Sequence, residues 1–217
     1  MKKWLICVIF GTGFLPACTS LDNSLTPDIE LYLKQGFEYY NKNEYGKAIA
    51  EYAKALQINP ADSNIYHCRG IAYYANRECD KAIADYDKAI LLNQHDAEIY
   101  NNRGHAYYVK EEYEKAVADY SRAIELNPND PEYYYNRAIA YGEKDIFGKA
   151  IADLTKAIEL KPDYVQSYFY RGLAYDETNQ PEKSKADLKK ALEFTPDYQE
   201  ARKALEEVET KLKSQKY

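Results

Sequence analysis

Arginine and aspartate recur along this chain at one fixed spacing, and they are the first residues that could carry chemistry. Four arginines follow one another at intervals of 34 residues, and an aspartate stands 16 residues after each of them. A row of cations could bind an anionic ligand, whereas an arginine beside its own acid forms an ion pair. Because every arginine has a matched acid, we expect partly buried ion pairs that orient pairs of helices. The pairs are Arg69–Asp85, Arg103–Asp119, Arg137–Asp153 and Arg171–Asp187.

The three histidines raise the question of a metal site or a catalytic base. His67 and His105 are expected to face the same side of the molecule. A metal site needs several more donors at fixed geometry, and only Asn101 and acids such as Glu98 are near in the sequence. No nucleophile beside a base, no glycine-rich phosphate loop and no Cys-x-x-Cys pair stands out. We therefore expect no metal, no cofactor and no catalytic activity.

The N-terminus has the layout of a secretory signal. It reads MKKWLICVIFGTGFLPAC, with two lysines before an apolar run that is short for a permanent membrane anchor. Its last four residues, Leu15 to Cys18, resemble the lipobox of bacterial lipoproteins, in which the cysteine is lipidated after cleavage. The resemblance implies a signal peptide at 1–17, a lipid on Cys18, and a lipidated cysteine and tether at 18–28. Plain secretion and an uncleaved anchor are the alternatives.

The charge balance limits the partners of the mature chain. The full sequence has 29 Lys and Arg against 35 Asp and Glu, so removal of Lys2 and Lys3 leaves 27 against 35, a net charge near −8. An acidic surface argues against nucleic acid as a partner and against a polybasic hold on anionic lipid. The residue after the cysteine is Thr19 and not aspartate. By resemblance to the enterobacterial sorting pattern, this favours the outer membrane over the inner membrane. We expect a chain anchored there by its lipid and facing the periplasm.

Two cysteines, Cys68 and Cys79, remain once the signal peptide and Cys18 are set aside. A disulfide between them is possible in an oxidising compartment. Their helices are predicted to run antiparallel, with the two positions offset by about a turn and a half along the axis. We therefore expect two buried thiols.

The 34-residue period extends to small and aromatic residues, and such a period indicates a stacked repeat. In the unit 97–130, a first helix carries the stripe Tyr100, Gly104 and Tyr107, and a second carries Ala116, Tyr120 and Ala123. Pro128 ends the second helix, and Asp130 can cap the next one. We expect Gly104 and Ala116 to let the two backbones approach closely, with tyrosines filling the space around the crossing.

These positions resemble the pattern of the tetratricopeptide repeat. The resemblance implies an all-α fold, a right-handed superhelical solenoid of helix-turn-helix repeats whose first helices line a concave groove. Local departures include Ala138 at a glycine position, and Ser184 and Lys185 in the last unit, as a terminal repeat would show. The five units are 29–62, 63–96, 97–130, 131–164 and 165–198, followed by a capping helix at 199–217.

The resemblance also indicates which side chains would contact a partner. A run of exposed aromatic side chains exceeds what a monomer needs and suggests a binding surface, although some of these residues could serve only to pack one repeat on the next. The family's carboxylate clamp is not supported, because Cys68, Asn102 and Asn136 stand where cations are needed. The predicted groove residues are Phe37, Tyr40, His67, Ile71, Tyr74, Asn101, Asn102, His105, Tyr108, Tyr135, Asn136, Phe169 and Asp176.

The sequence therefore predicts a non-catalytic scaffold or adaptor. Its partner would be a protein or a peptide, held near the membrane in a tyrosine-rich groove. Lipoproteins that contain such repeats act in envelope or pilus assembly, and the resemblance implies a role of this kind. The alternative is a soluble periplasmic or secreted holder, similar to a chaperone, without a lipid.

Overall fold

The computed structural model describes residues 26–214, so the predicted signal peptide, Cys18 and the tether up to residue 25 lie outside the described residues. Regular structure in the described part is entirely α-helical, which confirms the all-α fold class. None of the helices in this part is long and apolar enough to span a membrane. The helices are α2 (Pro27–Asn41), α3 (Tyr45–Ile58), α4 (Ser63–Ala75), α5 (Cys79–Leu92), α6 (Ala97–Val109), α7 (Tyr113–Leu126), α8 (Pro131–Glu143), α9 (Phe147–Leu160), α10 (Val165–Glu177), α11 (Pro181–Phe194) and α12 (Gln199–Ser214).

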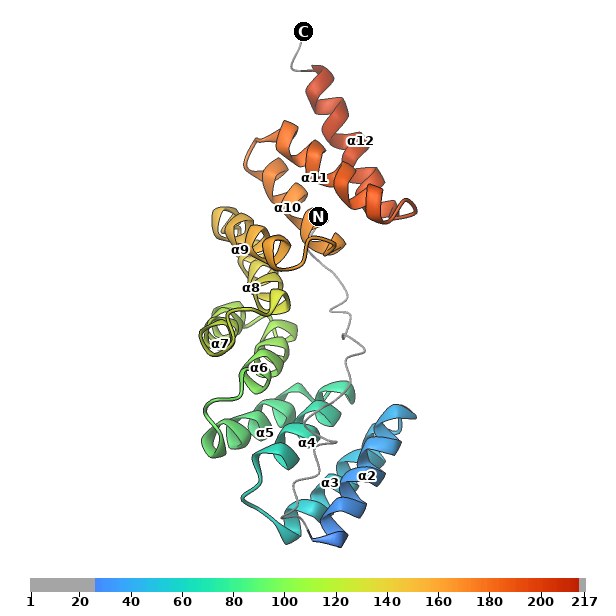
Figure 1. Ribbon diagram of the computed structural model, residues 1–217, viewed down its shortest axis with the longest axis vertical. Coiled ribbons are helices and arrows are strands. Elements are labelled where there is room, and N and C mark those ends of the chain that lie inside the picture. The colour runs from blue at the N-terminus through green and yellow to red at the C-terminus, as the bar shows by residue number, and fades with distance from the viewer. Residues whose placement is uncertain (1–25, 215–217) are drawn as a thin grey trace. The chain divides into compact units, whose positions relative to one another are not determined.

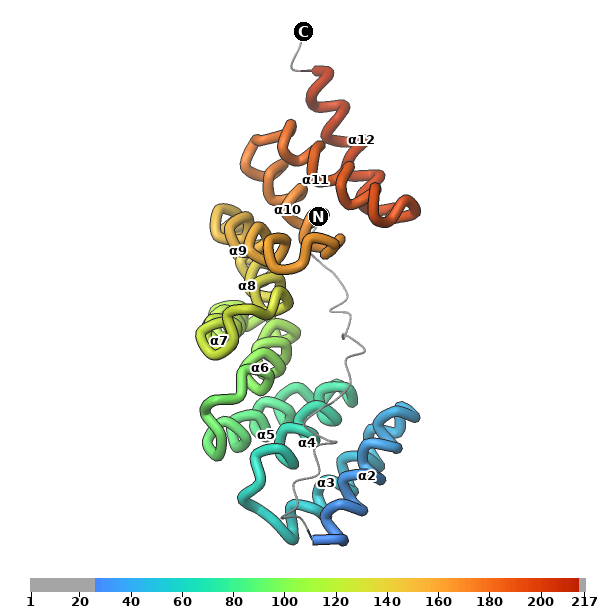
Figure 2. The backbone as a smooth tube through the Cα atoms, in the orientation of Figure 1, coloured from blue at the N-terminus to red at the C-terminus, as the bar shows by residue number. Residues whose placement is uncertain are grey.

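The helices group into two compact units, an N-terminal unit of residues 26–126 and a C-terminal unit of residues 127–214. In the N-terminal unit the pairs α2–α3, α4–α5 and α6–α7 pack in order, and α3 contacts α4 as α5 contacts α6 (Figure 1). In the C-terminal unit the pairs are α8–α9 and α10–α11, with α12 packed on α11 (Figure 2). This consecutive pairing is the helix-turn-helix stacking predicted from the 34-residue period.

Short polar segments separate one helix pair from the next, and aspartates begin three of the first helices. The side chains of Asp62, Asp96 and Asp130 accept hydrogen bonds of 2.8–2.9 Å from backbone N–H groups two residues later. These bonds satisfy amides that have no partner inside the helix. The predicted cap at Asp130 is therefore confirmed. Tyr164 and Tyr198 continue the same 34-residue series without an acid.

The turn inside each repeat contains no glycine or proline. In the third repeat, Glu111 has a left-handed backbone with φ of 60°. Its N–H donates to the carbonyl of Tyr108, and the N–H of Glu112 donates to that of Tyr107, both at 2.9 Å. This pair of bonds ends the helix although the side chain is not glycine. The equivalent residues are Asn43, Arg77, Asp145 and Asn179, with φ between 55° and 63°.

Glycine on the first helix makes room for an aromatic ring on the second. A Cβ added at Gly104 would lie 2.7 Å from Cε1 of Tyr120, whose ring is buried. Gly36 and Gly70 face Tyr52 and Tyr86 in the same way. Tyr120 lies one helical turn after Ala116, and its ring fills the space beside Gly104.

The fourth and fifth repeats solve the same packing problem with a smaller partner. Gly172 faces Leu188, with Cγ 3.0 Å from the position of an added Cβ. In the fourth repeat Ala138 stands at the glycine position and Leu154 at the tyrosine position, and both are fully buried. In the fourth repeat, therefore, a larger residue on the first helix is accompanied by a smaller one on the second.

The cysteines differ from the expectation of two buried thiols. Cys68 is buried, whereas Cys79 is a free thiol that is only partly buried. Because Cys79 is free, the two residues are not bonded to each other. The prediction that they form no disulfide with each other is confirmed, and the prediction that both are buried is wrong for Cys79.

The glycine–tyrosine contact predicts a double-mutant cycle. Gly104→Ala should lower the free energy of unfolding by about 1–3 kcal/mol, because the new methyl group overpacks against Tyr120. In the double variant with Tyr120→Leu, the loss should be smaller than the sum of the two single losses by at least about 1 kcal/mol. The reason is that the double variant recreates the combination of Ala138 and Leu154. Gly148→Ala is the control, because nothing lies within 4 Å of an added Cβ there. Urea unfolding measures Gly104→Ala, Tyr120→Leu, the double variant and Gly148→Ala. Purely additive losses in the double variant would contradict the packing described here.

Candidate protein-binding site

Each of the four arginines binds its predicted aspartate through two parallel hydrogen bonds. Nε and Nη2 of each guanidinium lie 2.7–2.8 Å from the two carboxylate oxygens. The arginine side chains are 16–19% exposed and the aspartates 8–10%. The hydrogen bond with Asp85 raises the pKa of Arg69 above its ordinary value. The prediction of partly buried ion pairs that join the two helices of a repeat is confirmed.

Tyrosines complete the surroundings of each guanidinium. Arg103 lies 5.7 Å from the ring centre of Tyr100 and 5.9 Å from that of Tyr107, one turn to either side on α6. Its remaining nitrogen, Nη1, bonds Asp87 of the preceding repeat at 2.6 Å. Arg171 reaches back in the same way to Thr155 Oγ1 at 3.0 Å. These arginines are therefore structural links, and the alternative of a row of cations for an anionic ligand loses its support.

The two acids on Arg103 differ in burial, and this difference predicts unequal effects on stability. Asp119→Ala removes the buried partner and should cost about 3 kcal/mol or more, because it leaves a partly buried charge without its main acid. Asp87→Ala removes a side chain that is 52% exposed and should cost about 1 kcal/mol or less. Denaturant unfolding of the two variants checks this order. Equal losses would mean that the bidentate pair does not hold α6 to α7.

The structure divides the predicted groove residues into two groups. Six are buried, so the expectation that they are exposed to a partner is wrong for them. They are His67, Ile71, Tyr74, Asn101, Asn136 and Phe169. The other seven are partly exposed: Phe37, Tyr40, Asn102, His105, Tyr108, Tyr135 and Asp176. Contact of any of them with a partner stays a prediction.

The buried histidine is used inside the N-terminal unit. His67 Nε2 on α4 lies 2.9 Å from Asn102 Nδ2 on α6, so the two side chains link the second repeat to the third. The imidazole also stands edge-on to Tyr86, with ring centres 5.9 Å apart. His105 lies between Asn101 and the hydroxyl of Tyr120, at 3.3 and 3.2 Å. Both imidazoles therefore serve packing between helices.

Burial of these imidazoles makes stability depend on pH. Burial lowers the pKa of His67 to about 4, against the opposing charge of Asp96, and burial lowers the pKa of His105 to about 4. A histidine in the unfolded chain has a pKa of about 6.5, so the unfolded chain takes up more protons between pH 6.5 and 4. The neutral imidazoles contribute fully to the free energy of unfolding above about pH 6.5. This contribution declines as the pH falls toward 4.

Replacement of both histidines tests this dependence. His67→Gln with His105→Gln should flatten the loss of unfolding free energy between pH 7 and 5, a range in which most carboxylates stay charged. His95→Gln, at an exposed histidine, should leave the slope unchanged. Urea unfolding across this pH range is the measurement. An unaltered slope in the double variant would show that the two imidazoles already carry protons in the folded state.

The second tyrosine of the repeated pair packs against the helix that follows. Tyr40 on α2 contacts Tyr45 on α3, and Tyr108 on α6 contacts Tyr113 on α7, with ring centres 5.4 Å apart in both cases. We call these two contacts the stacked tyrosine pairs. All four rings are partly exposed. Each pair presents a rigid aromatic edge, and rigid aromatic groups lose little conformational entropy on binding.

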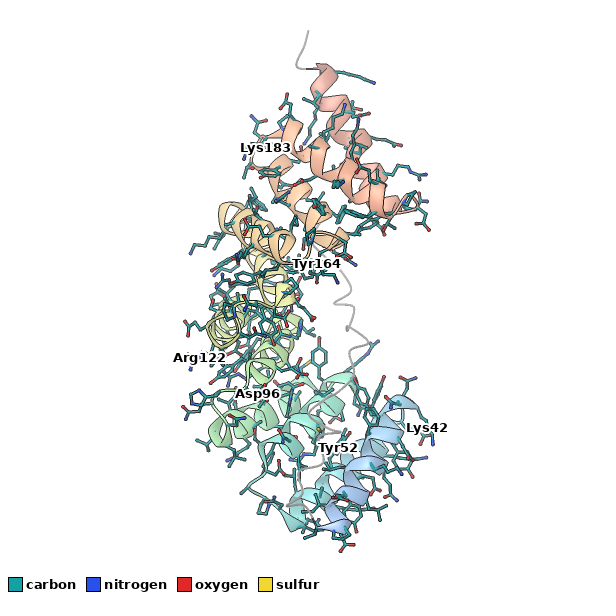
Figure 3. All side chains as sticks on the ribbon, viewed as in Figure 1. Lys42, Tyr52, Asp96, Arg122, Tyr164 and Lys183 are labelled. Atoms are coloured by element: carbon teal, nitrogen blue, oxygen red, sulfur yellow. The ribbon has the colours of Figure 1, made fainter. Side chains whose placement is uncertain are left out.

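The C-terminal unit holds aromatic residues that the sequence reasoning missed. Tyr135 lies 5.1 Å from Tyr164 and 5.8 Å from Tyr170, measured between ring centres. Phe169 lies 5.1 Å from Tyr170 and 4.9 Å from Tyr198. Tyr164, labelled in Figure 3, stands directly before α10. Tyr164 takes the place of the aspartates that cap the first helices of the preceding repeats. Because a tyrosine side chain cannot cap a helix, this exchange could have indicated from the sequence that Tyr164 has another role.

Asp176, one of the predicted groove residues, is bonded within the chain. Lys211 Nζ of α12 lies 2.8 and 2.7 Å from its two carboxylate oxygens. Lys185 on α11 similarly binds Glu209 on α12 at 2.8 Å. These two ion pairs hold the capping helix to the last repeat. The repeat pattern did not reveal them because Glu209 and Lys211 belong to the capping helix, which lies outside the 34-residue series.

The residues that the structure describes contain no group of three or more His, Cys, Asp and Glu side chains placed to hold a metal ion. The partly exposed aromatic side chains therefore remain the strongest candidates for contact with a partner.

Comparison with known families finds repeat models along most of the described chain. A model described as TPR repeat matches residues 36–76, 78–110 and 104–145. Two models described as tetratricopeptide repeat match residues 131–164 and 154–186. No curated relative matches the chain.

Solved structures give the same likeness. A crystal structure of MamA protein is 28% identical and covers 77% of this chain and 91% of its own, with a TM-score of 0.71. YrrB, described as a TPR protein with an unusual peptide-binding site, is 23% identical over 80% of this chain and 89% of its own, with a TM-score of 0.70. The first TPR of Spaghetti (RPAP3), bound to the HSP90 peptide SRMEEVD, is 28% identical over 54% of this chain and 92% of its own, with a TM-score of 0.53.

Proposed function

Because the chain belongs to the tetratricopeptide repeat family, we propose that it is a non-catalytic scaffold or adaptor that binds a protein or peptide. The family consists largely of interaction modules without catalysis of their own. A structure 28% identical to this chain carries a bound peptide, which supports a partner of the same class. The partner and the pathway differ from case to case in such folds, so the side chains of this chain decide what it binds.

The observation that carries the proposal is the pair of stacked tyrosine contacts. The arginines and His67 are occupied inside the fold, and Asp176 is bonded to Lys211. Tyr40 and Tyr108 instead keep part of their rings exposed while Tyr45 and Tyr113 hold them in place. Tyrosines of this kind are enriched among the residues that dominate binding energy at interfaces. We propose that a partner lays apolar or aromatic side chains across these rings.

We propose further that the chain is a lipoprotein whose lipid is on Cys18. The basic start, the short apolar run and the sequence Leu15 to Cys18 support this proposal. Several acyl chains on one cysteine would hold the chain on a membrane almost permanently, since each buried methylene contributes about 0.8 kcal/mol. The proposed location is the bacterial envelope, at the outer membrane and facing the periplasm, with a role in envelope or pilus assembly. The alternative, a soluble holder, predicts a mature N-terminus without acyl groups in mass spectrometry.

Capture of the partner tests the role of the stacked tyrosine pairs. Tyr40→Ala with Tyr108→Ala should weaken partner binding at least tenfold, because it removes two anchors of the surface, while the helical circular dichroism stays nearly intact. The matched control is Tyr39→Ala with Tyr107→Ala, one residue earlier, where each ring lies near a lysine instead. The measurement is quantitative pull-down from detergent-solubilised membranes. Undiminished capture by the first variant, or equal loss in both, would refute this surface.

A further inference from the structure

Exposed apolar side chains gather at one part of the N-terminal unit. Six large hydrophobic residues among those described are at least 40% exposed, and four of them belong to the first two repeats. These four are Leu31, Ile58, Leu91 and Leu92, with exposures of 49%, 46%, 68% and 43%. Leu126 occupies the position of Ile58 and Leu92 in the third repeat and is less exposed. Within the N-terminal unit this apolar exposure is therefore greatest in the first two repeats, and Phe194, at the same position in the fifth repeat, is again 43% exposed.

These four residues lie along the edge where first helices begin and second helices end. Ile58 and Leu92 are the last residues of α3 and α5, and Leu31 lies near the start of α2. Two contacts bring such ends together: Lys54 of α3 lies over the ring of Tyr32 of α2, and Ser63 at the start of α4 bonds the carbonyl of Ala89 in α5. We call this set of four residues the apolar edge.

The opposite edge of the same unit is polar. It carries the turns inside the repeats, with exposed residues at Lys42 and Asn43, Asn76 and Arg77, and Lys110 and Glu111. Val109 is the large apolar residue exposed there, at 50%. Figure 3 shows Lys42 of this polar edge and Asp96, which follows α5, on opposite sides of the N-terminal unit. The two edges therefore differ in chemistry although both consist of helix ends.

The chain approaches the apolar edge from the proposed lipid. Thr26 directly precedes α2, so it lies at this edge and not at the polar one. Thr26 is the eighth residue after Cys18, and a chain of that length spans at most about 28 Å. Lipid on Cys18 would keep the apolar edge close to the membrane whatever path the tether takes. This argument rests on the proposed lipidation.

We propose that the apolar edge rests on the lipid surface to which Cys18 is anchored, with Leu31, Ile58, Leu91 and Leu92 inserted among the headgroups and upper acyl chains. Asp28 is exposed and Glu30 partly exposed beside Leu31, so the contact depends on apolar insertion and not on attraction to anionic lipid. The polar edge then points away from the membrane. In this arrangement the chain is held at the membrane by its lipid and oriented by its own surface.

Tryptophan fluorescence tests the proposal without background, since the one tryptophan, Trp4, lies in the predicted signal peptide. The lipidated full-length product is purified in detergent and placed in vesicles of phosphatidylethanolamine and phosphatidylglycerol. Leu91→Trp reports on the apolar edge, and Val109→Trp, at a similarly exposed residue on the polar edge, is the matched control. Lipids brominated on the acyl chain should quench Leu91→Trp several-fold more strongly than Val109→Trp. Added 1 M salt should not change this ratio.

Three other outcomes overturn the proposal in distinguishable ways. If Cys18 carries acyl groups in mass spectrometry and the chain co-sediments with vesicles, equal quenching of the two tryptophans refutes the apolar edge and leaves the lipid anchor in place. If Cys18 carries no acyl group and the chain stays in the supernatant, both the anchor and the orientation are refuted. Quenching of Leu91→Trp that disappears in 1 M salt refutes insertion in favour of an electrostatic contact.

Discussion

The bidentate pair between an arginine on the first helix and an aspartate on the second is the interaction on which the rest of this structure depends. It recurs in four of the five repeats with nearly constant geometry, and tyrosines cover each guanidinium. In the first repeat, where Gln35 replaces the arginine, Glu51 binds Lys54 instead. Such pairs add little net stability but penalise any other alignment of the helices. Because each guanidinium is paired with an aspartate, the four arginines are not available to bind an anionic ligand.

Packing around the ion pairs follows from the size of two facing residues. A glycine accepts the ring of a tyrosine in the first three repeats, whereas leucine stands opposite glycine or alanine in the last two. Other tyrosines are buried as well, and Tyr74 is buried at the repeat position that Tyr40 and Tyr108 occupy. Tyr40 and Tyr108 stay partly exposed, and the function proposed for the chain rests on these exposed aromatic side chains.

Much of the fold could be predicted from the sequence because the same residue types recur at the same positions in several repeats. The spacing of Arg103 and Asp119 predicted their contact, and the Asp130 cap could be located from its position before Pro131. The left-handed backbone at Glu111 could not be predicted, since it is set by hydrogen bonds and not by residue type. The burial of His67 was missed because its partner, Asn102, comes from the next repeat, 35 residues away. Sequence periodicity shows which face a residue occupies, but it does not show which neighbour covers that face.

The central claim is that the arginines hold the repeats together and leave binding to the tyrosines. Nuclear magnetic resonance of the arginine Nε–H groups tests it most directly, because each of these groups donates to an aspartate in the folded chain. Four Nε–H signals should exchange slowly with water and should not shift when millimolar sulfate or phosphate is added. Fast exchange, or shifts that saturate with the anion, would show that the arginines are an open ligand site and would contradict this account.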